Sequence, residues 1–476
     1  MSKNLIVIMS DEHQASMLGS NGHDFIQTPH LDALAERGMK YTNAYTPCPI
    51  CVPARAAFAS GQYVHRTGHW DNAIAYSGTP RGWGHQLQEA GIPVTSIGKL
   101  HYRSVRDEAG FDTSHIPMMI KDEVGMIWAS IRHEDQRLPM PDRMLGPEIG
   151  PGESAYTQYD RAVTKTSVEW ISNNAGEDAG WCLYIGLVAP HFPLVCPDEF
   201  YDLYRDINLP EIKQHPDKGF VRHPWLEKQN AMGDNENKFT SAEERDRAFR
   251  AYYGLVSWMD HNVGQIMSAV SKAGLDDETT IIYTSDHGDN VGARGMWGKS
   301  NMYDESAAIP MIAAGPGIDR GLCHTPVSLI DLAASIPDHF NLPVSADMDG
   351  TPLCDIAGKP YDADRAVFSE YHAVGAVDGA FMIRKGDFKL IHYVGFDPEL
   401  FNLSQDPEEL VNLADSPDYA VVRDDLYRAL KAICDPDAVN AQAHEEQLAL
   451  VMSYGGLDAV KDMGPKAATP PPTVTL

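Results

Sequence analysis

The sequence predicts an α/β fold, in which helices cover both faces of a large, mostly parallel sheet, with a smaller α+β domain at the C-terminus. Two observations lead to this prediction. Short apolar runs rich in β-branched residues alternate with amphipathic segments through residues 1–360, and several of these runs stop abruptly at polar residues. Beyond about residue 366, short strand-like runs joined by a tight turn replace that alternation.

The first apolar run, residues 4–9, predicts a buried strand that stops at Ser10-Asp11-Glu12-His13. Thr28-Pro29 then predicts a helix start and Gly38 its end, because threonine caps helices, proline suits the first turn and glycine the end. We expect further strands at 93–97, 181–187, 279–284 and 309–314, and helices at 84–90, 156–174, 242–273 and 328–340. Polar residues that follow parallel strands should gather at one edge of the sheet, where ligands bind.

Three domains are expected from these changes of pattern. A large α/β domain spans residues 1–360, and a smaller domain with an antiparallel sheet and a helix spans 361–440. In the smaller domain, Lys385-Gly386-Asp387 predicts a hairpin turn, and a helix is expected near 419–434. Residues 441–476 form an extension or arm, which is proline-rich from Gly464. An arm that completes a neighbouring subunit's pocket is one reason to expect a homo-oligomer, either a dimer or a tetramer.

Composition limits the partners. The formal net charge is −29, from 67 acidic and 38 basic residues, which argues against nucleic acid and anionic membranes as partners. An anionic small molecule remains compatible, because a site needs only a few local cations. No apolar run approaches the length of a membrane span, and the first residues do not resemble an export signal. With seven cysteines that lack close pairing, we expect a cytoplasmic protein.

Cys51-Val52-Pro53-Ala54-Arg55 predicts a nucleophile at the N-terminus of a helix. Pro53 suits the first helical turn, small residues continue the helix, and Gly61 ends it. Free backbone amides and the positive end of the helix dipole would then face Cys51. Arg55 adds a fork of donors suited to a tetrahedral oxyanion. The alternative is a buried structural cysteine beside an ordinary helix.

Two pairs of potential metal ligands follow two predicted strands. Asp11 and Glu12 end the first strand, and Asp286 and His287 follow the strand at 279–284. Each pair taken alone is typical of loop caps, but both pairs together with Cys51 predict a divalent metal site. An imidazole ligand favours manganese over calcium. Whether Glu12 is a ligand or a hydrogen-bonding partner of the metal ligands or the substrate stays open.

Residues 51–61, CVPARAAFASG, resemble the signature of the type I sulfatases, in which a formylglycine-generating enzyme oxidises the cysteine to an aldehyde. Residues 285–299 resemble the second metal segment of that family with its downstream lysine, and residues 400–414 resemble its C-terminal strand and turn. The resemblance extends from about residue 3 to 435 and implies the fold of the alkaline phosphatase superfamily. The Asp286-His287 pair is most similar to the choline sulfatase and phosphonate monoester hydrolase branches.

The same resemblance assigns a cationic shell around the substrate anion. Gly98-Lys99-Leu100-His101 and the Pro-His-x-Pro segment at 190–193 follow predicted strands and match family segments. The residues implied to act on the substrate are Arg55, Asn72, Lys99, His101, His191 and Lys299. Arg55, Lys99 and Lys299 would hold the anionic oxygens, His191 or Lys299 would protonate the leaving group, and His101 would act as the base that regenerates the aldehyde.

We therefore expect a metal-dependent sulfuric ester hydrolase acting on aryl or small organic sulfates. The closest alternative is a phosphonate monoester hydrolase or phosphodiesterase using the same residues. A catalytically silent protein that only binds an oxyanion or metal is a third possibility. Residues 111–152, with Trp128, His133 and Arg137, are expected either to line the substrate pocket or to form a surface insertion.

Overall fold

The computed structural model describes residues 3–140, 142–176, 180–464 and 469–473. At its centre is an eight-stranded sheet in the order β11-β2-β10-β9-β1-β7-β4-β5. Its strands are β1 (Asn4–Asp11), β2 (Met39–Tyr41), β4 (Val94–Lys99), β5 (Thr113–Met118), β7 (Cys182–Pro190), β9 (Thr279–Ser285), β10 (Met311–Ala314) and β11 (Gly321–Cys323). Strands β9, β1, β7, β4 and β5 are parallel, and only β10 runs against both of its neighbours. The mostly parallel sheet is thus confirmed.

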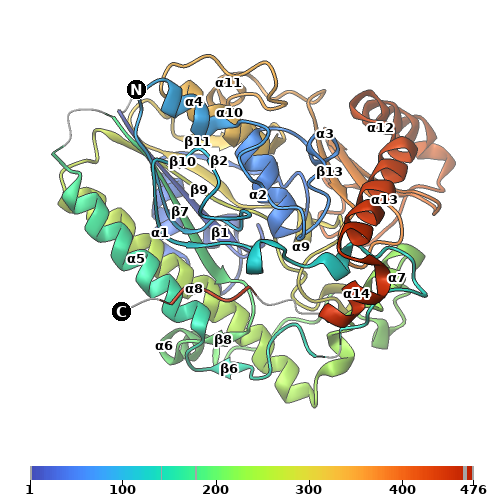
Figure 1. The fold of residues 1–476 in the computed structure, drawn as a ribbon. Helices are drawn as coiled ribbons and strands as arrows, with labels where there is room; N and C mark the ends of the chain where they lie inside the picture. The colour runs from blue at the N-terminus through green and yellow to red at the C-terminus, as the bar shows by residue number, and fades with distance from the viewer. Residues whose placement is uncertain (1–2, 141, 177–179, 465–468, 474–476) are drawn as a thin grey trace.

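Helices bury both faces of this sheet, as Figure 1 shows. Ile6 and Ile8 of β1 pack into one apolar cluster with α1 (Pro29–Glu36), α5 (Ala155–Asn173) and α8 (Ala242–Lys272). Leu5, Val7 and Met9 pack on the other side, with α2 (Cys51–Ser60), α4 (Trp83–Glu89) and α10 (Leu329–His339). Side chains alternate across a strand, so burial of all of them requires a helical layer on each face.

The C-terminal part contains a four-stranded antiparallel sheet. Its strands are β13 (Ala366–Tyr371), β14 (Ala380–Lys385), β15 (Phe388–Tyr393) and β16 (Glu399–Asn402). The predicted turn at 385–387 joins β14 to β15, and α12 (Ala420–Ile433) packs on both strands. The shorter elements are β3 (Ala44–Tyr45), β6 (Gly150–Pro151), β8 (Val195–Cys196), β12 (Val327–Ser328), α3 (Val64–Thr67), α6 (Asp198–Tyr201), α7 (Pro224–Asn230), α9 (Asp304–Ala307) and α11 (Leu353–Ala357).

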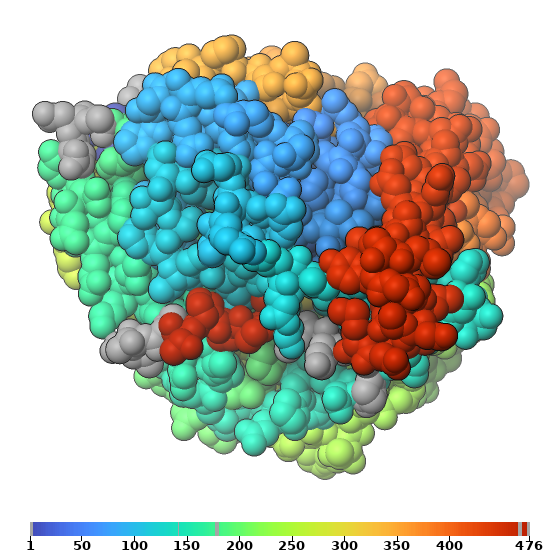
Figure 2. Space-filling view, viewed as in Figure 1, coloured from blue at the N-terminus to red at the C-terminus, as the bar shows by residue number. Residues whose placement is uncertain are grey.

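Most of the described part of the extension at 441–476 is helical. Two further helices, α13 (Pro436–Ser453) and α14 (Gly456–Met463), pack against residues 127–130. Residues 469–473 lie apart from these helices as a separate red patch in Figure 2. None of the helices in the described ranges has the length and apolar character needed to cross a bilayer.

Candidate active site

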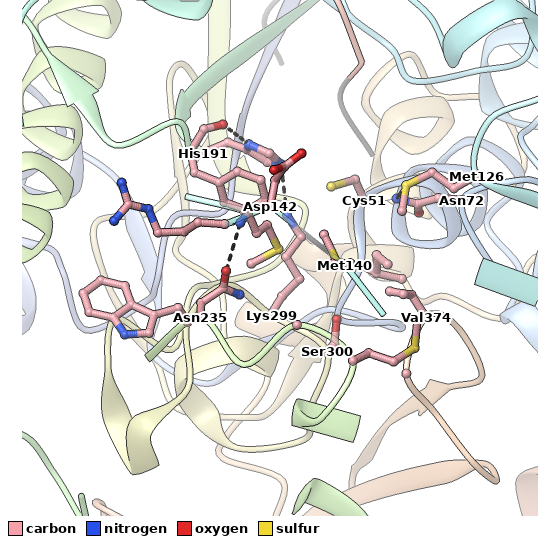
Figure 3. A pocket seen from close by; sticks show the side chains of 18 of the residues that line it. Cys51, Asn72, Met126, Met140, Asp142, His191, Asn235, Lys299, Ser300 and Val374 are labelled. Atoms are coloured by element: carbon pink, nitrogen blue, oxygen red, sulfur yellow. Dashed lines mark hydrogen bonds between the residues drawn. The ribbon is translucent and has the colours of Figure 1, made fainter. Parts of the chain in front are cut away.

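Four neighbouring parallel strands end in polar residues at the same edge of the sheet. Asp11 is the last residue of β1 and Lys99 the last of β4, while Asp286 follows β9 and His191 follows β7. A cavity of about 580 Å³ opens there, lined by Cys51, Asn72, Lys99, His101, His191 and Lys299 among others. Figure 3 shows Cys51 and Asn72 on one side of this cavity and His191 and Lys299 on the other. These six residues, which the sequence analysis assigned to one site, thus lie around one cavity.

Cys51 is the first residue of α2, as the sequence predicts. Its side chain is 1% exposed, and its Sγ lies 3.1 Å from His287 Nε2 and 3.6 Å from Asp11 Oδ1. Burial, assisted by the Asp11 carboxylate, raises the pKa of the Cys51 thiol to about 12. The unmodified side chain is therefore a protonated thiol at neutral pH, which is a weak nucleophile.

The donor atoms of Asp11, Cys51, Asp286 and His287 all lie within 4.8 Å of one another, and all four residues are buried. His287 Nδ1 is 2.9 Å from the carbonyl oxygen of Gly288, which assigns the hydrogen to Nδ1 and leaves the lone pair of Nε2 toward the cluster. Two carboxylates, an imidazole and the side chain at position 51 are a donor set that fits a divalent transition metal.

Arg55 differs from its expected role. Its guanidinium donates to Asp286 Oδ2 at 2.7 Å and to Asp11 Oδ2 at 3.1 Å, and Nη1 donates to the Lys99 carbonyl and the Tyr184 hydroxyl. The side chain is 1% exposed and does not appear in the cavity wall. The expectation that Arg55 holds the oxygens of the substrate is thus corrected, because the carboxylates of the candidate metal ligands occupy its donors.

Asp11 is a buried carboxylate surrounded by cationic side chains. Lys99 Nζ lies 2.6 Å from Asp11 Oδ2, and both side chains are buried. Burial alone would raise the pKa of Asp11, but the charges around it, Lys99 first and Arg55 among them, hold it well below its usual range. Asp11 is therefore ionised and ready to ligate a cation.

Glu12, Lys299 and His191 form a second group. Lys299 Nζ lies 2.8 Å from Glu12 Oε2 and 3.0 Å from His191 Nε2. His191 Nδ1 faces the Phe192 carbonyl oxygen, so Nε2 accepts from the lysine and the ring is neutral. Burial and then Lys299 lower the pKa of His191 well below its usual value. Glu12 Oε1 is buried without a hydrogen-bond partner among the described residues, and burial raises the pKa of Glu12.

His101 and Asn72 complete the predicted set. His101 lies two residues beyond the end of β4 and adopts a positive φ of 58°, a backbone conformation that is uncommon for a residue other than glycine. Its Nε2 lies 3.0 Å from Thr469 Oγ1, while Nδ1 is buried without a described partner. Asn72 Oδ1 accepts a hydrogen bond from the Val52 N–H at 3.3 Å, directly beside Cys51.

Several wall residues were not expected from the sequence. Tyr156 lines the cavity, and its hydroxyl donates to the Thr469 carbonyl at 2.6 Å. Thr469 belongs to the C-terminal arm, so the described part of the arm reaches the pocket of its own chain. The other wall residues include the methionines Met126, Met140, Met144, Met232 and Met296. Single methionines carry no pattern that would reveal a pocket wall, although their flexible thioethers suit an adaptable surface.

Residues 111–152 contribute to the cavity, through Met126, Met140 and Asp142 among others. The three residues singled out from the sequence lie elsewhere. Trp128 is buried in a separate apolar cluster, His133 is exposed, and Arg137 donates to the Gly375 carbonyl at 2.8 Å. Part of this segment thus lines the cavity, whereas Trp128, His133 and Arg137 do not.

Comparison with known proteins shows similarity to sulfatases in sequence. A family model described as Sulfatase matches residues 3–342, and one described as N-sulphoglucosamine sulphohydrolase, C-terminal, matches residues 292–435. A choline-sulfatase of Rhizobium meliloti is 31% identical over 95% of this chain and 91% of its own length. Arylsulfatase K of Danio rerio is 29% identical over 93% and 85%, respectively. In fold, the chain is similar to a phosphonate monoester hydrolase of Agrobacterium radiobacter, with a TM-score of 0.71, 21% identity, and coverage of 90% and 95%.

Proposed function

Because the chain belongs to the sulfatase family and is a sulfuric ester hydrolase, we propose that its nucleophile is a formylglycine derived from Cys51. The observation that carries this proposal is the position of Cys51, at the start of α2 and within 4.8 Å of Asp11, Asp286 and His287 donor atoms. The modification, which replaces the thiol by an aldehyde, requires a formylglycine-generating enzyme and an external oxidant. Its hydrate would supply the hydroxyl that attacks sulfur.

A divalent cation, manganese or calcium, would be held by Asp11, Asp286, His287 and the side chain at position 51. When bound, it would neutralise charge that develops on the oxygens in the reaction. Side chains of the protein would bind the anion and deliver the proton. Lys99 and Lys299 lie in the cavity wall, where their ammonium groups attract the sulfate oxygens. Lys299 also donates to His191, so this pair is placed to deliver a proton to the leaving oxygen.

We propose a small organic sulfate ester, aryl or alkyl, as the substrate. Two relatives of high coverage carry the names choline-sulfatase and Arylsulfatase K, and the methionine-rich wall suits an apolar leaving group. Phosphonate monoester hydrolysis is the second candidate. Asn72 and His287, at positions that resemble both the choline sulfatase and the phosphonate monoester hydrolase branches, lie next to Cys51 and would serve either ester.

The test is a pair of kcat/KM measurements, on 4-nitrophenyl sulfate and on a 4-nitrophenyl phosphonate monoester, with manganese supplied. A preference for the sulfate supports the main proposal, and a preference for the phosphonate supports the second. Mass spectrometry of the peptide that contains Cys51 shows whether the aldehyde is present. Cys51→Ala should remove turnover, and if it leaves turnover intact, the proposed nucleophile is wrong.

A cytoplasmic location and a dimer or tetramer stay predictions. All seven cysteines are unpaired in the structure, which suits a reducing compartment. Light scattering of the purified protein would measure the mass of the assembly.

A further inference from the structure

The orientation of Asn72 depends on its own hydrogen bond to α2. Asn72 Oδ1 accepts from the Val52 N–H, so its Nδ2 amide group is the end left to donate to a ligand in the cavity. Nδ2 has only a weak contact of 3.8 Å, to the Met126 sulfur. An amide that presents its donors beside the nucleophile suits an anionic oxygen, provided that the loop carrying Asn72 is held still.

The preceding residue, Asp71, holds that loop. Asp71 is fully buried, and its Oδ1 accepts from the Ala73 N–H at 2.8 Å. Its Oδ2 accepts from Ser130 Oγ at 2.6 Å and from Gln447 Nε2 at 2.7 Å. A buried carboxylate needs such donors, since each unmet hydrogen bond would cost stability.

Gln447 lies on α13 and connects three separate parts of the chain. Besides Asp71, its Nε2 donates to the His372 carbonyl at 3.0 Å, and its Oε1 accepts from Arg132 Nη1 at 2.9 Å. Its side chain is fully buried. The neighbouring Glu446 accepts from Trp70 Nε1 at 2.6 Å. Two adjacent residues of α13 thus hold the two residues that precede Asn72.

We propose that Gln447 is a positioning residue of the sulfatase site, which acts through Asp71 to fix Asn72 beside Cys51. The inference rests on the proposed function, since the ligand in question is the anionic group of a sulfate ester. The matched family models end at residue 435, and α13 begins at Pro436. A helix outside the matched models therefore holds, through Asp71, the loop that places Asn72 in the cavity wall.

The test is a double-mutant cycle between Gln447→Met and Asn72→Ala, assayed on 4-nitrophenyl sulfate. Methionine keeps the volume of Gln447 and removes its hydrogen bonds, and we expect Q447M to lower kcat/KM about tenfold. If Gln447 acts through Asn72, Q447M has no further effect in the N72A background. If the decrease in kcat/KM of the double variant instead equals the product of the two single decreases, Gln447 has a general structural role and the proposal is overturned. Gln265→Met, the same change at an exposed position of α8, is the control and should leave kcat/KM unchanged.

Two further measurements keep the test decisive. Ser130→Ala removes a different donor to Asp71 and leaves α13 intact, so the cycle is repeated with S130A if Q447M does not fold. Mass spectrometry of the Cys51 peptide confirms that each variant carries the same modification. An inactive wild-type protein would contradict the proposed function, whereas an active wild type with independent losses contradicts only the role of Gln447.

Discussion

Arg55→Lys should weaken metal binding far more than substrate binding. The Arg55 guanidinium makes two charge-assisted hydrogen bonds, at 2.7 Å to Asp286 and 3.1 Å to Asp11. Lysine keeps the charge, but its single ammonium cannot reproduce both bonds together with those to the Lys99 carbonyl and the Tyr184 hydroxyl. Each lost charged hydrogen bond is worth about 1.5–3 kcal/mol. We therefore expect metal affinity to fall about ten- to a hundredfold, which is the usual effect of removing a partner of metal ligands.

The assay has two parts, with manganese as the probe. Calorimetric titration of the chelator-treated enzyme gives the Kd for manganese, and steady-state kinetics at saturating manganese give KM for 4-nitrophenyl sulfate. The control is Arg66→Lys, which makes the same change in an exposed ion pair with Asp349. The reasoning is refuted if R55K raises KM and leaves the manganese Kd unchanged, because Arg55 would then act on the substrate anion.

Three further predictions address the leaving group, the arm and the pH dependence of stability. Lys299→Met should lower kcat by about a hundredfold or more on alkyl sulfates and less on 4-nitrophenyl sulfate, since good leaving groups need little protonation; equal losses on both would contradict the role in proton delivery. Truncation after Asp462 removes Thr469 from His101 and should raise the ratio of kcat/KM for bulky over small sulfate esters, whereas an unchanged ratio would show that the arm does not shape the pocket. Burial raises the pKa of Asp260 from 3.8 to about 7, so the folded protein binds this proton more tightly than the unfolded chain and loses that stability as pH rises from about 4 to 7. Asp260→Asn should flatten that part of the profile of urea midpoints against pH, and a profile identical to that of the wild type would contradict the shift.

The sequence was sufficient to predict those site residues that directly follow strands. Asp11 and Asp286 come directly at or after apolar runs, and the parallel order of β1 and β9 brings those strand ends together. Arg55 shows the limit of this reasoning. Its spacing from Cys51 is visible in the sequence, but whether a guanidinium faces a carboxylate or a substrate depends on which other strands converge on it.

The extension illustrates a second limit. Asp435-Pro436 is a recognisable helix start, and the Asp435 side chain does accept from the Asp437 N–H. The helix that follows lacks a clear apolar stripe, because it buries polar groups such as Gln447 as well as Val451. A pattern based on hydrophobicity cannot detect a helix whose buried face makes hydrogen bonds.

The position of β1 in the sheet has a consequence for biosynthesis. Leu5 pairs with Cys182 on one side and with Thr280 on the other, so β1 lies inside the sheet between two strands from much later in the chain. The apolar run from Leu5 to Met9 meets its first neighbour, β7, only after residue 182 and its second, β9, only after residue 279 of the 476-residue chain. Closure of such long loops is slow, and an unpaired apolar strand is prone to aggregate meanwhile. Production of this enzyme should therefore depend on chaperones and on low temperature more strongly than its folded stability would suggest.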